Sequence, residues 1–276
     1  MRKLFAVLLA AGLFYARPSS AQDKWIIKAD KIDPANYYGI TVANGMIGIV
    51  SSPEPFKVKN VVLAGAYDLY GRGRVSNFLN SFNLLNMYLE VNGKRIEAGN
   101  IKNFSQQLDM EHAAFTTTFD YGDEASIKYT YYSLRQLPFT VLMDISITAK
   151  KQINITGASV MEAPDALKDV QNYYNEIDRP HVTISLLTST AKSPTGKLQL
   201  CASNTFLFNE PHGQEPRVIH EMWDNNMHLM KFSKNIAAGQ TYRYALAGSS
   251  ITSAHNADPL NEAERLTMFA KLEGAD

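Results

Sequence analysis

Acidic side chains that could work as a catalytic pair occur in three short groups, each in a segment predicted to be a loop. Two carboxyl groups on either side of a substrate bond can act as general acid and general base, which would allow hydrolysis. The groups are Glu162 with Asp165, Glu210 with Glu215, and Glu221 with Asp224. Their spacing equally fits solvated charges on a loop surface, which is the favoured interpretation. The sequence therefore assigns no catalytic residue.

Three histidines, His212, His220 and His228, recur at a spacing of eight residues. Zinc sites usually combine closer ligands, such as two histidines four residues apart on a helix. We therefore predict no metal site. The sequence contains no G-x-S-x-G motif, phosphate-binding loop or dinucleotide fingerprint, so no cofactor is predicted. The single Cys201 lies in an alternating segment and is interpreted as a small buried residue rather than a nucleophile.

A glycine-flanked loop brings together arginine and amide side chains. Arg72 and Arg74 alternate with Gly71 and Gly73, and Asn77 follows within three residues. Planar donors beside amides suit either a cluster of sugar hydroxyls or a buried hydrogen-bond network at a contact between domains. This loop is therefore the candidate for contact with a ligand or with another domain.

The first 21 residues have the form of a secretory leader. Arg2 and Lys3 precede a short apolar run, and small residues follow at positions 19–21. This arrangement is typical of a signal peptide, and the apolar run is too short to span a bilayer comfortably. We expect cleavage near Ala21-Gln22, a secreted or periplasmic location, and no membrane span.

The charge of the remaining chain is nearly balanced. The full sequence has 27 basic and 27 acidic side chains, and the leader carries three of the basic ones and none of the acidic ones. The chain after residue 21 therefore has a net charge of −3. Nucleic-acid binding needs an excess of basic residues to neutralise phosphates, so nucleic acid is not a predicted partner.

Most of the chain after the leader alternates as β-strands do. Residues 141–147 place apolar side chains at every second position, the period of a half-buried strand. Similar segments recur about every ten residues, and turn signals such as Asn44-Gly45 and Asn92-Gly93 lie between them. No strand–helix–strand rhythm appears. The pattern predicts an all-β sandwich or barrel.

Three segments depart from this pattern. Residues 162–180 predict a long surface loop or a short helical insertion, and residues 205–225 predict a second loop, because both contain prolines and charges. At the end, Asp258-Pro259 can begin a helix and Gly274 can close it, with apolar residues at helical spacing between them. The apolar face of this helix must pack either on the β domain or on further structure.

The turns and strands of the first hundred residues carry a family resemblance. The segments are Y-G-I-T-V-A-N-G-M-I-G-I-V (38–50), G-R-G-R-V-S-N-F (71–78) and F-N-L-L-N-M-Y-L-E-V-N-G (82–93). They contain an N-G-x-x-G turn, at Asn44, Gly45 and Gly48, and a later strand that ends in an N-G hairpin. In these features the chain resembles the N-terminal domain of glycoside hydrolase family 65, over essentially all of residues 25–273.

The resemblance implies the fold and the domain order. Residues 22–256 would form a large antiparallel super-sandwich, similar to the galactose-mutarotase fold, and residues 257–276 would begin a helical linker. In the family a helical barrel follows and holds the catalytic glutamates. This sequence ends where the linker would begin. We therefore expect the domain's main partner, the barrel, to be absent from the chain.

The resemblance also implies a function. It is closest to the branch of secreted α-glucosidases that hydrolyse gluco-disaccharides such as kojibiose by inversion, with one glutamate as acid and another as base for water. This chain would be the accessory N-terminal domain, inactive alone, and would meet α-gluco-oligosaccharide only in the complete enzyme. Arg72, Arg74 and Asn77 would lie beside the substrate or against the barrel. The domain could also contribute to a homodimer.

Two alternatives belong to other functional classes. A stand-alone carbohydrate-binding module would need an exposed aromatic platform, for which the loop pair Tyr173-Tyr174 is the best candidate; we expect no measurable sugar binding. A mutarotase-like sugar epimerase would need a convergent histidine and glutamate. Glu111 and His112 do not supply this, because neighbours on a strand point to opposite faces.

Overall fold

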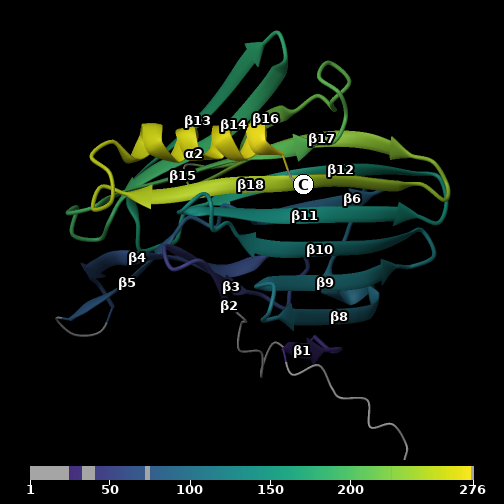
Figure 1. The fold of residues 1–276 in the computed structure, drawn as a ribbon, viewed down its shortest axis with the longest axis horizontal. Helices are drawn as coiled ribbons and strands as arrows, with labels where there is room; N and C mark the ends of the chain where they lie inside the picture. Colours follow the sequence, from purple (N-terminus) through teal and green to yellow (C-terminus); the bar gives the residue numbers. More distant parts are fainter. Residues whose placement is uncertain (1–24, 33–40, 72–74, 225, 275–276) are drawn as a thin grey trace, which may run out of the picture.

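The computed structural model describes residues 25–32, 41–71, 75–224 and 226–274. These residues form three antiparallel β-sheets, one short 3₁₀-helix, η1 (Ala98–Asn100), and one α-helix (Figure 1). The predicted all-β fold class, with a helix at the end of the β domain, is confirmed. Within the described ranges, no helix is both long and apolar enough to cross a membrane.

The largest sheet has nine strands, in the order β1-β8-β9-β10-β11-β18-β15-β14-β13. They are β1 (Ile26–Ala29), β8 (Lys102–Asp109), β9 (Ala114–Tyr121), β10 (Ala125–Ser133), β11 (Thr140–Ala149), β18 (Thr241–Thr252), β15 (Gln199–Phe208), β14 (Val182–Lys192) and β13 (Lys168–Arg179). The short β1 and the long β13 are the two edges of this sheet.

Two smaller sheets complete the β structure. One has five strands: β16 (Ile219–Met222), β17 (Met227–Ile236), β12 (Ile153–Glu162), β6 (Met87–Val91) and β7 (Lys94–Arg95). The other has four: β2 (Thr41–Ala43), β3 (Ile47–Ser51), β4 (Val58–Leu69) and β5 (Ser76–Ser81). Asn92 and Gly93 join β6 to β7 with φ angles of 52° and 75°, as their turn signal predicted.

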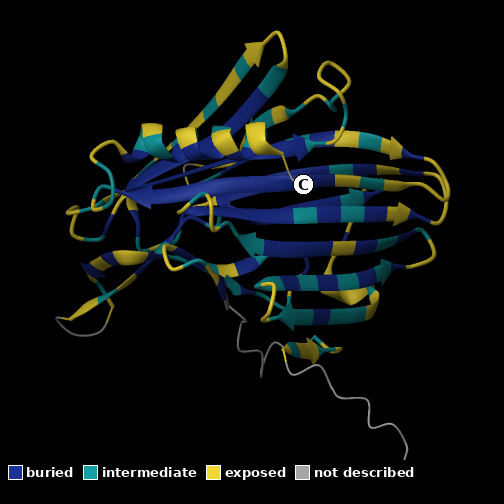
Figure 2. Ribbon diagram, in the orientation of Figure 1, coloured by how far each residue is buried: buried dark blue, intermediate teal, exposed yellow. Residues whose placement is uncertain are grey.

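Both smaller sheets pack against one face of the nine-stranded sheet. The ring of Phe232 on β17 lies 5.0 Å from that of Phe206 on β15 and 4.9 Å from that of Tyr244 on β18. Ser81 of β5 makes a hydrogen bond of 2.6 Å with Ser250 of β18. Along each strand every second side chain points into the space between the sheets, and one continuous apolar core fills this space. The central strands are buried (Figure 2).

The α-helix α2 (Pro259–Glu273) covers the opposite face of the nine-stranded sheet. It begins at Asp258, whose side chain accepts the Asn261 N–H, and ends at Gly274, whose φ is +84°. Its Ala270 packs on Ala245 and Ala247 of β18. The sequence left open whether the helix packs on the β domain or on further structure, and in the structure it packs on the β domain. Small residues on the outer face of β18 let α2 approach closely.

The prediction for residues 162–180 was wrong. Most of this segment is strand β13, paired with β14 over Lys168–Arg179. It was missed because an edge strand in a projecting hairpin buries little, so its sequence is polar and lacks clean apolar alternation. The second predicted loop begins later than expected, because β15 continues to Phe208, and β16 lies within the remainder.

Candidate functional site

The loop predicted for residues 71–83 is only partly a loop, because Ser76–Ser81 form strand β5, which pairs with β4. Arg72 and Arg74 fall outside the described residues. Asn77 is half-buried on β5, and its Nδ2 donates to the carbonyl of Tyr70 at 2.6 Å. The amide thus closes the hairpin, a local role that is neither the sugar contact nor the domain contact suggested by the sequence.

The outward face of this hairpin is apolar. Tyr67, Leu69 and Phe78 are exposed, and the rings of Tyr67 and Phe78 stand opposite each other at 4.7 Å. Phe78 keeps 58% of its surface in solvent. An exposed apolar cluster of this kind commonly marks a surface that contacts another protein or domain.

The inward side of the hairpin is fixed to the sandwich by Asp68. This buried carboxylate accepts the Thr195 N–H at 2.8 Å and the Thr195 hydroxyl at 2.6 Å. Burial alone would raise the pKa of Asp68. Hydrogen bonds from Ser193, Thr195 and Leu69 outweigh this effect and hold the pKa far below its usual value. The exposed face is therefore firmly positioned relative to the sheet.

The three acidic groups do not form catalytic pairs in the structure. Glu210, Glu215 and Glu221 each pair with a lysine, at 2.5 Å to Lys234, 2.8 Å to Lys271 and 2.5 Å to Lys231. Glu162 and Asp165 are exposed. The interpretation as solvated loop charges holds only in part, because Glu162 and Glu221 lie on strands and the three ion-paired glutamates fasten the 209–222 segment to neighbouring elements.

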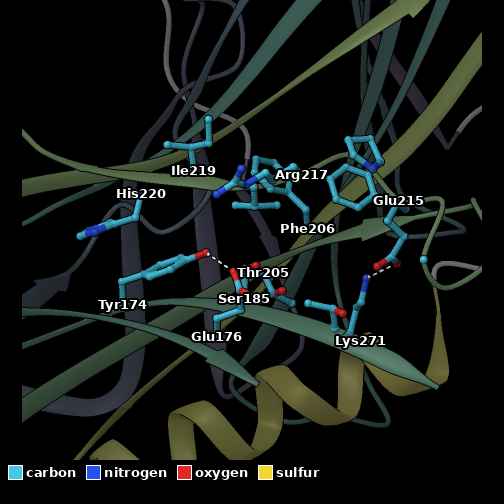
Figure 3. Close-up of a pocket in the computed structure, with 15 residues that line it drawn as sticks. Tyr174, Glu176, Ser185, Thr205, Phe206, Glu215, Arg217, Ile219, His220 and Lys271 are labelled. Carbon is cyan, nitrogen blue, oxygen red and sulfur yellow. Dashed lines mark hydrogen bonds and ion pairs between the residues drawn. The ribbon is translucent and has the colours of Figure 1, made fainter. Parts of the chain in front are cut away.

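A cavity of about 420 Å³ opens where the nine-stranded sheet splits. β14 pairs with β15 only from Leu187 to Lys192, and its first half, still paired with β13, diverges as a two-stranded ribbon. The gap between Ser185 of β14 and Thr205 of β15 is closed by the 213–220 segment and by the last turn of α2. We call this space the Tyr174 cavity (Figure 3).

The polar wall of the Tyr174 cavity carries balanced charge. Glu176, Arg217 and the Glu215–Lys271 ion pair all line it. Lys271 is largely buried and lies over the ring of Phe208, 5.6 Å from its centroid, which joins α2 to the cavity floor. Among the described residues, Arg217 forms no ion pair, and Figure 3 shows it beside the open space.

Tyr174 stacks on a histidine that is itself held by a relay of hydrogen bonds. Its ring stacks on His220, at 4.7 Å and 5° between the planes. His220 Nε2 lies 3.2 Å from His228 Nδ1, and His228 Nε2 lies 2.9 Å from the Ser189 hydroxyl. Ser189 donates to Asn172 Oδ1, so we assign His228 Nε2 as the donor to Ser189 and His220 Nε2 as the donor to His228.

Burial sets the protonation of this relay. It lowers the pKa of His228 to about 3 and, more weakly, lowers that of His220. His228 is therefore neutral near pH 7, as the assigned direction of its hydrogen bonds requires. Burial also raises the pKa of Tyr174, whose hydroxyl stays protonated and donates to Glu176 Oε2 at 3.2 Å.

The sequence analysis had considered Glu111 with His112, and Tyr173 with Tyr174, as candidate sugar-site residues. Glu111 and His112 lie in the exposed β8–β9 turn, not on a strand, and His112 is hydrogen-bonded to Asp109. Tyr173 and Tyr174, expected in a loop, both lie on strand β13, where Tyr173 is exposed and Tyr174 is half-buried. No cluster of three or more metal-ligating side chains occurs in the part of the chain that the structure describes.

The comparisons with known proteins agree with this architecture. Residues 39–275 match the model of the glycosyl hydrolase family 65 N-terminal domain. The chain is 74% identical over 276 residues to a kojibiose hydrolase of Mucilaginibacter mallensis, covering all of this chain and 41% of that protein. It is 50% identical over 270 residues to a kojibiose hydrolase of Flavobacterium johnsoniae, covering 98% and 39%. The chain thus spans about two fifths of these curated relatives.

A solved structure supports the fold. A protein described as a kojibiose phosphorylase from the human microbiome superposes with a TM-score of 0.66 at 13% identity, over 90% of this chain and 36% of its own. With the match of the family model to residues 39–275, the sheets described above have a clear assignment: the chain belongs to glycosyl hydrolase family 65, as its N-terminal domain.

Proposed function

We propose that this chain is the non-catalytic N-terminal domain of a secreted, inverting α-glucosidase that hydrolyses kojibiose and related α-gluco-disaccharides. The observation that carries the proposal is the 74% identity to a kojibiose hydrolase along the entire chain. Bond cleavage would be the task of two glutamates in the part of the enzyme that the match does not cover, one as general acid and one as base for water.

The role of the domain would be to hold and orient that catalytic part. The β4–β5 hairpin offers a suitable surface, because the exposed Tyr67, Leu69 and Phe78 stand on a ribbon that Asp68 fixes to the sandwich. Burying such rings against a second domain gives a hydrophobic gain without first ordering a loop.

A chimera tests the proposed function. Residues 1–276 are joined to the remainder of the Mucilaginibacter mallensis relative, and kojibiose cleavage is followed by NMR. We expect the purified chain alone to release no glucose, and the chimera to release β-glucose first, since inversion converts the α-bond. The native relative is the control. Cleavage by the chain alone, or a folded but inactive chimera, would contradict the proposal. The secreted product should begin at Gln22.

We further propose that Arg72, Arg74 and Asn77 support the rim of the substrate cleft. In the chimera, Arg72→Ala should lower kcat/KM by about tenfold, because a shifted cleft wall misplaces the substrate. Arg179→Ala, an exposed arginine at the far end of β13, is the matched control and should leave kinetics unchanged. Equal turnover and equal KM in both variants would refute this role.

A further inference from the structure

We propose that the Tyr174 cavity is a binding site for a neutral, hydroxyl-rich ligand of one or two hexose units. This site is separate from the β4–β5 hairpin and does not depend on the proposed function. Its volume of about 420 Å³ lies in the range of small-molecule sites, about 300–1,000 Å³. It is lined by β13, β14 and β15, by the 213–220 segment and by the last turn of α2.

The split of the sheet leaves hydrogen-bonding capacity in the cavity wall. From Thr205 onward, β15 has no strand partner on its β14 side among the described residues, although it stays paired to β18 on the other side. The Thr205 hydroxyl, in a residue only 1% exposed, has no partner among the described residues. Buried polar groups are normally satisfied, so this wall has the donors and acceptors that a ligand would use.

The charge and shape of the cavity favour a neutral polyol over an anion. Two acids and two cations line the cavity: Glu176, Glu215, Arg217 and Lys271. Glu215 and Lys271 already neutralise each other in an ion pair. In such a cavity a carboxylate can accept a hydrogen bond from one hydroxyl while a guanidinium donates to another, which suits the several hydroxyls of a sugar ring. Phe206 and Phe208 supply apolar surface for the ring carbons.

Binding needs a fixed wall, and the histidine relay provides it. Tyr174 is held flat by His220, which is held in turn by His228 and Ser189. Its hydroxyl points to Glu176 and Ser185 (Figure 3). The Tyr174 hydroxyl is thus presented to a ligand with little entropy loss on binding.

Calorimetric titration of the purified chain tests the site, with D-glucose, kojibiose, sorbitol and inorganic phosphate as probes. The cavity reverses the expectation from the sequence, which was no measurable sugar binding. We expect a saccharide to bind in the millimolar range or more tightly, and to bind better than sorbitol, which cannot present a rigid ring. We expect phosphate not to bind. Phosphate binding without saccharide binding, or no saccharide binding by the folded chain, would overturn the proposal.

Three variants locate the binding. Glu176→Gln and Arg217→Ala should each weaken saccharide affinity by about tenfold, the size expected for one lost charge-assisted hydrogen bond. Thr205→Val should weaken it without lowering Tm, since valine replaces an unpaired buried hydroxyl. Glu111→Gln, in the exposed β8–β9 turn, is the matched control. Affinity unchanged in all three variants would show that the saccharide binds elsewhere and would overturn the assignment.

Discussion

Replacing Gly248 with alanine should destabilise the domain by about 3 kcal/mol or more, the upper range for overpacking a core. Gly248 lies on the central strand β18, between Val141 of β11 and Asn204 of β15. A Cβ there would lie 2.9 Å from the Asn204 Cβ, 2.9 Å from the Ser203 carbonyl oxygen and 2.4 Å from Leu84 Cδ1. Leu84 can rotate away, but backbone and Cβ atoms cannot.

Asn204 is also held from behind. Its Nδ2 donates to the Leu84 carbonyl at 2.7 Å and to the Ser159 hydroxyl at 3.0 Å, so moving β15 outward would strain bonds that link the two sheet layers. The new methyl group therefore acts on the whole stack of sheets rather than on one side chain.

Two other glycines give a matched series for this prediction. Gly99 has open space around its Cβ position, and alanine there should change stability by less than about 0.5 kcal/mol. At Gly157 the Cβ would meet the ring of Phe232 at 2.8 Å and the Tyr244 hydroxyl at 3.1 Å, both side-chain atoms, so we expect an intermediate loss. Urea unfolding measures all three. A Gly248→Ala variant as stable as Gly99→Ala would disprove the packing argument.

The buried His228 should make the domain sensitive to mild acid. Its pKa is about 3 in the folded state against 6.5 as a free side chain, so the unfolded state binds more protons between these values. The stabilisation is fully present above pH 6.5 and is lost as the pH falls toward 3. In the middle of this window the loss is about 1.4 kcal/mol per pH unit.

The measurement is the pH dependence of the free energy of unfolding from pH 7 to pH 4.5. We expect His228→Asn to be less stable at pH 7, because the relay is broken, but to lose less stability than wild type on acidification. His181→Asn, an imidazole exposed in the β13–β14 turn, should behave like wild type. Parallel curves for wild type and His228→Asn would refute the assignment.

Local signals were sufficient to predict much of the fold. The alternation at 141–147 became β11, the Asn92-Gly93 turn joins β6 and β7, and the Asp258 and Gly274 signals bracket α2. Each of these depends on residues close together in sequence, whose periodicity or φ preference acts locally. Strand β13 could not be predicted from its own sequence, because it has no clear apolar alternation. It is a strand because it pairs with β14 in a projecting hairpin.

The Tyr174 cavity could not be predicted in this way. Its residues come from β13, β14, β15, the 213–220 segment and α2, and they meet because β14 is separate from β15 before Leu187. No local pattern encodes the point at which two long strands part. The sequence shows the eight-residue spacing of His212, His220 and His228, which was compared only with the spacing of zinc ligands. It does not show that His220 and His228 form a hydrogen-bonded pair on the adjacent strands β16 and β17.

The open ends of the nine-stranded sheet bear on how this domain behaves at high concentration. An unpaired strand edge is a template for adding strands from other molecules, which leads to fibres. Here one end is only four residues long, and the other, β13, has the charged side chains Lys168, Asp169, Glu176, Asp178 and Arg179. Extending the sheet would remove water from these charges. We therefore expect the domain to resist runaway polymerisation, and any homodimer to form through a different surface.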